Sequence, residues 1–66
     1  MFVTINGKQE ELTEKITVGE FLLLQQLDFD SVVVEHNRII VEKEAFGNTL
    51  LEENDHLEVL RFVGGG

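Results

Sequence analysis

The chain has 66 residues, which is enough for one domain with a thin core and too few for a deep catalytic cleft. It contains no cysteine, which excludes disulfides, thiolate metal sites and thiol nucleophiles and leaves the cytoplasm as the expected compartment. Thirteen acidic and five basic residues give a net charge of −8, so neither nucleic acid nor an anionic membrane is an expected partner. The apolar runs are too short to span a bilayer, and no basic segment typical of a signal peptide precedes them.

The chain begins with a predicted β-hairpin. Residues 2–6 alternate as a strand does, with Val3 and Ile5 on one face. Asn6-Gly7 is a strong signal for a hairpin turn. The partner strand is expected over about residues 9–16, with Leu12 facing inward. Its many glutamates indicate an edge strand that faces water.

A helix is predicted over residues 18–27. Thr17 and Glu20 have the spacing of a capping box, in which each side chain accepts a hydrogen bond from the other's backbone N–H. Ile16 and Phe21 are placed for a hydrophobic staple across this cap. The apolar face of the helix is expected to hold Val18, Phe21, Leu22 and Leu24.

Leu23 and Leu27 fall off that apolar face. Leu23 is a candidate exposed contact, and a loop that covers it is the alternative. The helix therefore carries more leucine than one buried stripe needs.

Three more strands are predicted in the second half of the chain. Residues 31–36 are rich in β-branched side chains, and Asn37-Arg38 forms the turn to a short strand over residues 39–42. Residues 43–46 are expected to form a single helical turn that Gly47 ends. After a turn at residues 53–55, the last strand runs from residue 56 or 57 to residue 63. Leu57 and Val59 are expected to face inward, with Leu60 and Phe62 on the opposite side.

The element order β-β-α-β-β-β indicates an α+β domain. We expect a mixed sheet of four to five strands with one main helix packed on one face. Its other face then stays open and partly apolar, which makes it a candidate docking surface. The domain is expected to occupy residues 1–63, with residues 64–66 as a flexible glycine tail.

The sequence closes on Gly64, Gly65 and Gly66, directly after an apolar run. Glycine has no Cβ, so such a segment can enter a narrow channel in almost any backbone conformation. Its one chemically useful group is the terminal carboxylate of Gly66, which an ATP-dependent activating enzyme could reach. On composition alone, a frayed terminus or an artificial extension is an equal alternative.

The whole chain resembles the ThiS family of thiamine-biosynthesis sulfur carriers, which have the ubiquitin-like β-grasp fold. The matching segments are Asn6-Gly7, the helix start at residues 17–22, the strand pair at residues 32–41, and residues 55–66 with their Phe-Val-Gly-Gly-Gly ending. That ending is the most specific part. The chain departs from the family pattern at Asn37-Arg38, at Asn54 and in lacking a proline near Glu42, all of which affect loops and leave the tail intact.

The resemblance implies a carrier that is a co-substrate, not an enzyme, and that binds no cofactor itself. A ThiF-like adenylyltransferase would use MgATP to adenylate Gly66, and a persulfide from a cysteine desulfurase would convert it to a thiocarboxylate. A ThiG-like thiazole synthase would then accept the sulfur. Gly64 and Gly65 would give clearance for threading the tail. The candidate docking residues are Phe2, Leu60, Phe62 and Val63. The free carrier is expected to be a monomer.

Three other functions remain open from the sequence. Two keep the glycine chemistry: a MoaD-like carrier for molybdopterin synthesis and a ubiquitin-like modifier. The third is a β-grasp module that binds a basic partner non-covalently. A metal site is not expected, because His36 and His56 lack partners at ligand spacing and the acidic residues lack the pattern of a calcium loop. Both histidines are expected at surface or turn positions.

Overall fold

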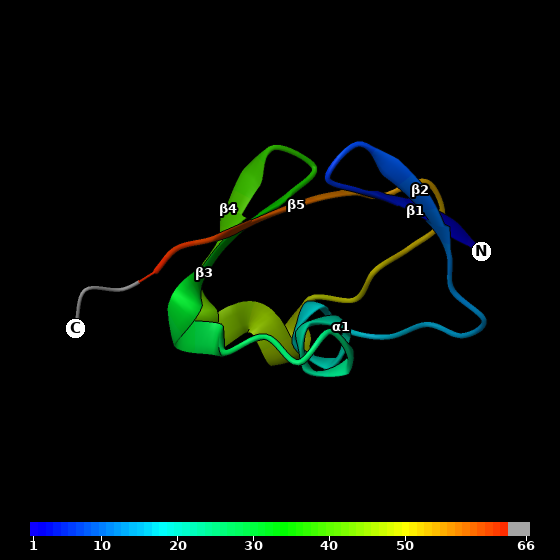
Figure 1. Ribbon diagram of the computed structural model, residues 1–66. Helices are drawn as coiled ribbons and strands as arrows, with labels where there is room; N and C mark the ends of the chain where they lie inside the picture. Colours follow the sequence, from blue (N-terminus) through cyan, green and yellow to red (C-terminus); the bar gives the residue numbers. More distant parts are fainter. Residues whose placement is uncertain (64–66) are drawn as a thin grey trace.

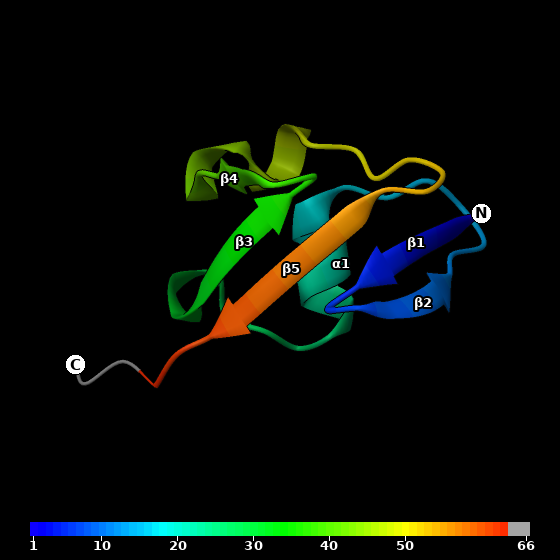
Figure 2. The same cartoon turned by 90° about the horizontal axis from the view of Figure 1, so that it is seen from above.

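A computed structural model describes residues 1–63 of the chain. Its five strands form one sheet in the order β2-β1-β5-β3-β4. The strands are β1 (Phe2–Ile5), β2 (Lys8–Glu11), β3 (Val32–His36), β4 (Ile39–Val41) and β5 (His56–Arg61). β5 pairs parallel with β1, and every other pairing is antiparallel, so the sheet is mixed. Figure 2 shows β5 crossing the centre of the sheet between β1 and β3.

The helix α1 (Val18–Leu24) lies against one face of this sheet (Figure 1). Its start agrees with the predicted capping box: the Thr17 hydroxyl accepts from the Glu20 backbone N–H at 3.1 Å, and Glu20 Oε1 accepts from the Thr17 N–H at 2.8 Å. Ile16 and Phe21 are both buried beside this cap. The predicted α+β architecture with one main helix is confirmed.

The helix is shorter than predicted and buries less leucine. It ends at Leu24 and not near Leu27, because Gln26 takes a left-handed φ of 60° and the backbone N–H of Leu27 bonds to the carbonyl of Leu22. That bond is the 6→1 closure of a Schellman-type helix end. Leu24 is 69% exposed, so its predicted place in the core is wrong: at about 100° per residue it lies about 160° around the helix from the buried Leu22. Leu23 is 65% exposed, and a covering loop is wrong as well.

The core lies between the sheet and the layer of α1. Val3, Val34 and Leu57 come from three neighbouring strands and are at most 1% exposed. The other buried apolar residues are Ile16, Val18, Phe21, Leu22, Val32, Phe46 and Leu51. Leu57 faces inward as predicted, and Val59 packs against this core as a partly buried residue.

Several predicted strand ends are corrected. β2 ends at Glu11, five residues before the predicted end, and Leu12 only partly reaches the core. Residues 13–16 run across to the helix, where Ile16 and Leu51 are joined by a backbone hydrogen bond of 2.9 Å. Ser31 belongs to the short 3-10 helix η1 (Phe29–Ser31), not to β3. β4 stops at Val41 and β5 at Arg61.

The predicted single helical turn is a longer 3-10 helix, η2 (Lys43–Asn48), which continues past Gly47. It places Phe46 in the core, where the ring meets Phe29 edge-on with centroids 5.2 Å apart. Gly19 of α1 allows this approach: a Cβ there would lie 3.3 Å from the Phe29 ring and 3.4 Å from the Phe46 backbone. η2 and α1 together therefore cover one side of the sheet.

Candidate functional site

The central strand β5 leads towards the C-terminal glycines. After the strand ends at Arg61, the backbone N–H of Phe62 still donates to the Ser31 carbonyl at 2.9 Å. Val63 is 99% exposed and is the last residue described. The predicted sulfur-bearing Gly66 and the predicted threading residues Gly64 and Gly65 lie outside the described residues. The described part thus carries the chain to the place where the predicted tail begins.

Two asparagine side chains, one from each hairpin turn, form hydrogen bonds with the backbone of β5. Asn6, in the β1–β2 turn with φ 51°, accepts from the Val59 N–H at 2.7 Å and donates to the Val59 carbonyl at 3.2 Å. Its side chain thereby imitates a paired strand residue. Asn37, in the β3–β4 turn with φ 52°, accepts from the His56 N–H at 2.9 Å and donates to Asp55 at 3.1 Å. The sequence indicated both as turn residues, but their hold on β5 was missed because it joins residues far apart in the chain.

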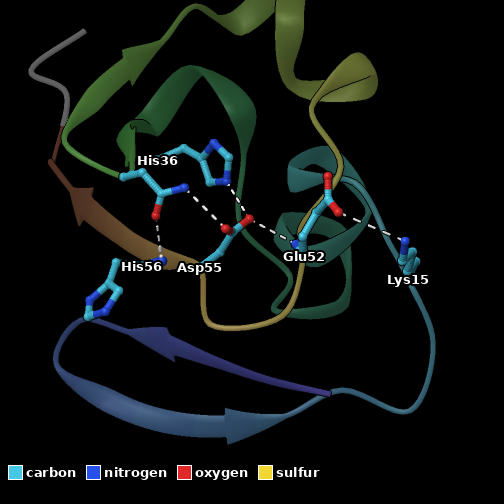
Figure 3. A network of polar contacts seen from close by, with 6 residues as sticks. Lys15, His36, Glu52, Asp55 and His56 are labelled. Atoms are coloured by element: carbon cyan, nitrogen blue, oxygen red, sulfur yellow. Dashed lines mark hydrogen bonds and ion pairs between the residues drawn. The ribbon is translucent and has the colours of Figure 1, made fainter.

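Asp55 collects three hydrogen bonds at the start of β5 (Figure 3). His36 Nε2 lies 2.6 Å from its Oδ2, which also accepts from the Glu52 backbone N–H at 2.8 Å, and Asn37 bonds to its Oδ1. Partial burial raises the pKa of Asp55, but the bonds from His36, Asn37 and Glu52 outweigh it and bring that pKa below its ordinary value. His36 is thus a half-buried strand residue, not the surface or turn histidine predicted, whereas His56 is exposed at the start of β5.

The sheet face opposite α1 is uncovered within residues 1–63, and we call it the open face. The predicted docking residues are exposed there or just beyond β5: Leu60 is 67% exposed, Phe62 43% and Phe2 42%. Val33, which pairs directly with Leu60, and Ile40 of β4 are exposed to 41% and 54%. Neither residue was among the predicted docking residues, although both lie in predicted strands that are rich in β-branched side chains.

Two carboxylates interrupt the apolar residues of the open face. Glu35 of β3 and Glu58 of β5 are direct cross-strand partners, and like charges placed opposite each other are destabilising. Glu35 also pairs with Ile40 on its other side. A hollow lined by both glutamates, Val33 and Leu60 lies over this pair. The open face therefore combines apolar side chains with negative charge, which suits a partner that presents apolar and basic groups.

The described residues offer little for other chemistry. No group of three or more His, Asp or Glu side chains among residues 1–63 is placed to hold a metal ion. None of the helices in the described part is long and apolar enough to cross a membrane. What the geometry provides is a rigid strand that leads to the glycines beside an exposed apolar and acidic surface.

A mixed sheet wrapped around one helix, with its central strand leading into a glycine ending, defines a ubiquitin-like β-grasp domain. A crystal structure of a thiamine biosynthesis protein (ThiS) from Geobacter metallireducens superimposes with a TM-score of 0.85 at 36% identity, and the match covers 100% of both chains. Residues 3–66 match the model of the ThiS family. The chain belongs to the ThiS family.

Two curated relatives show the lengths over which this family likeness extends. The sulfur carrier protein ThiS of Bacillus subtilis is 35% identical over 63 residues, which cover 94% of this chain and 96% of that protein. A thiazole synthase of Paramagnetospirillum magneticum is 33% identical over 66 residues, which cover 100% of this chain and 20% of that protein. The chain thus spans about a fifth of the length of that synthase and nearly all of the Bacillus carrier.

Proposed function

We propose that the chain is a sulfur carrier of thiamine biosynthesis that supplies sulfur for thiazole formation and is not itself an enzyme. The observation that carries this proposal is the match with the Bacillus subtilis sulfur carrier protein over nearly the full length of both chains. The likeness to a thiazole synthase segment supports a ThiG-like synthase as the acceptor. The likeness to a ThiS sulfur carrier, together with the likeness to a segment of a thiazole synthase, favours the thiamine pathway over the molybdopterin pathway.

In this proposal the reacting group is the carboxylate of Gly66. A carboxylate is ionised at neutral pH and is a poor electrophile, so it must first be activated. A ThiF-like adenylyltransferase would join it to the α-phosphate of MgATP and release pyrophosphate. A persulfide formed by a cysteine desulfurase would then attack the acyl carbon and displace AMP. A thiol would cleave the resulting acyl disulfide, which leaves a thiocarboxylate on Gly66.

The rest of the chain would present the reacting group to its partners. Gly64 and Gly65 would let the chain enter an active site without side-chain clashes. The open face, with Leu60, Phe62 and Phe2, would dock on the partner, and Val63 would follow the tail inward. The Asn6 bond to Val59 would keep β5, and with it the start of the tail, in a fixed place relative to the open face. Because the activation consumes MgATP, we place the carrier in the cytoplasm.

The proposal is tested by mass spectrometry of the intact chain and of its C-terminal peptide. The chain is incubated with MgATP, cysteine, a thiol and lysate of a thiamine-starved bacterium, with the Bacillus carrier as positive control. We expect one oxygen to be replaced by sulfur on Gly66, only when ATP is present. A variant that lacks Gly65 and Gly66 should fold alike and remain unmodified.

Other results would contradict the proposal in distinct ways. An unmodified Gly66, in lysate that does modify the Bacillus carrier, would favour a non-covalent binding module. Gly66 found in isopeptide linkage to lysines would indicate a protein modifier. Sulfur transfer that persists in the shortened variant would show that the reacting group is not Gly66.

A further inference from the structure

The helix α1 carries a second exposed apolar surface, away from the open face. The adjacent Leu23 and Leu24 are 65% and 69% exposed, whereas the other large apolar residues of the helix, Val18, Phe21 and Leu22, are buried. Two hollows adjoin them, and both are lined in part by Glu14, Ile16 and Leu24. We call this surface the helix groove, and it consists of Glu14, Ile16, Glu20, Leu23 and Leu24.

The rim of the helix groove is acidic. Glu14 and Glu20 line the hollow beside the leucines, and neither carboxylate is in an ion pair with a basic side chain within residues 1–63. Lys15, the nearest basic residue in sequence, lies 3.9 Å from Glu52 instead. Glu20 uses one oxygen for the Thr17 backbone N–H. The groove therefore has an apolar floor and an uncompensated negative edge.

The helix groove and the open face lie on opposite sides of the molecule. α1 packs beneath the sheet (Figure 1). Leu60 lies on the other face of the sheet, because it stands three residues after the buried Leu57 in β5 and successive side chains of a strand alternate. A protein bound to the open face would leave Leu23 and Leu24 uncovered. A second protein could then contact the carrier at the same time.

We propose that the helix groove docks a protein segment that presents apolar side chains flanked by lysine or arginine. The exposed leucines would bury against those apolar side chains, and Glu14 and Glu20 would attract the flanking cations. A second copy of this chain does not fit, because its net charge is −8 and its own groove has the same acidic rim. This inference goes beyond the proposed sulfur transfer and does not depend on the chemistry at Gly66.

The experiment is an amide-shift titration of the ¹⁵N-labelled full chain by NMR. The probe is a synthetic amphipathic helical peptide made only of leucine and lysine, and its matched control has glutamate in place of every lysine. We expect saturable shifts at residues 13–26 with the lysine peptide and not with the glutamate peptide, while any binding of the lysine peptide to the open face would shift β3 and β5 as a separate set. Raising the ionic strength from about 0.05 M to about 0.5 M should weaken this binding, because exposed charges are screened.

Matched variants separate the helix groove from the open face. The double variant L23Q/L24Q should weaken binding of the lysine peptide at residues 13–26 at least about tenfold, while L60Q on the open face should leave the affinity at these residues unchanged. E14K, in an exposed loop, should weaken it by charge alone. The proposal is overturned by an absence of saturable shifts at residues 13–26, by equal binding of the glutamate peptide there, or by an unchanged affinity there in folded L23Q/L24Q. Failure here would leave Gly66 sulfuration unaffected, and the reverse also holds.

Discussion

Replacing Asn6 with glycine measures how firmly the strand that leads to the tail is held. Glycine adopts the φ of 51° without strain, so N6G removes the two side-chain hydrogen bonds to Val59 and adds only the unfolded-chain entropy that the N54G control also adds. At about 1 kcal/mol for each bond, the free energy of unfolding should fall by about 2 kcal/mol. N6A loses the same bonds and must also adopt a left-handed backbone, so it should lose about 3 kcal/mol.

The assay is urea unfolding followed by far-UV circular dichroism, since the chain has no Trp or Tyr to report by fluorescence. Amide exchange at Val59 gives a local readout, because its N–H is the donor to Asn6. N54G is the matched control: Asn54 also has a left-handed φ, of 70°, but its side chain makes no hydrogen bond within residues 1–63. The reasoning is refuted if N6G stays within about 0.5 kcal/mol of the parent and exchange at Val59 is unchanged.

Four further results are expected. The pKa of Asp55 is lower in the folded than in the unfolded chain, so its contribution to stability is present above about pH 4 and is lost as the pH falls through the folded value; D55N should flatten this part of an acid-unfolding curve. T17A should lower the free energy of unfolding by about 1 kcal/mol in urea, since it removes one side of the capping box. L57A should cost about 2–5 kcal/mol in the same assay, because Leu57 is fully buried, and a near-neutral result would contradict its place in the core. L60Q should leave stability within about 0.5 kcal/mol of the parent but slow thiocarboxylate formation, and equal rates would remove Leu60 from the docking surface.

The sequence predicted the features of this fold that depend on neighbouring residues. The Asn6-Gly7 turn, the Thr17–Glu20 capping box and the inward side of β5 each follow from local spacing or alternation, and the structure agrees with all three. The choice of an α+β sheet with one covering helix then followed from the order of the elements. These predictions needed no knowledge of distant contacts.

The predictions that were wrong concern the ends of elements and contacts between distant segments. The helix pattern continued through leucines to residue 27, but the left-handed Gln26 ends it, and no local rule singles out glutamine for that role. Leu24 was assigned to the core although the helical spacing places it nearly opposite Leu22. His36 was predicted at the surface because its partner, Asp55, follows 19 residues later. The roles of Gly64, Gly65 and Gly66 remain predictions.

The strand order also determines which sheet edges of this protein could pair with another copy of the chain. β2 and β4 are the two edges of the sheet, and an unpaired edge is a template for pairing with another chain. β2 is entirely exposed and has the sequence Lys-Gln-Glu-Glu, and these charged side chains disfavour pairing with another chain. β4 has no charged residue, and only its short length of three residues disfavours such pairing. Its Ile39 is 70% exposed. Aggregation at high concentration should therefore start at β4, and the substitution I39K should reduce it.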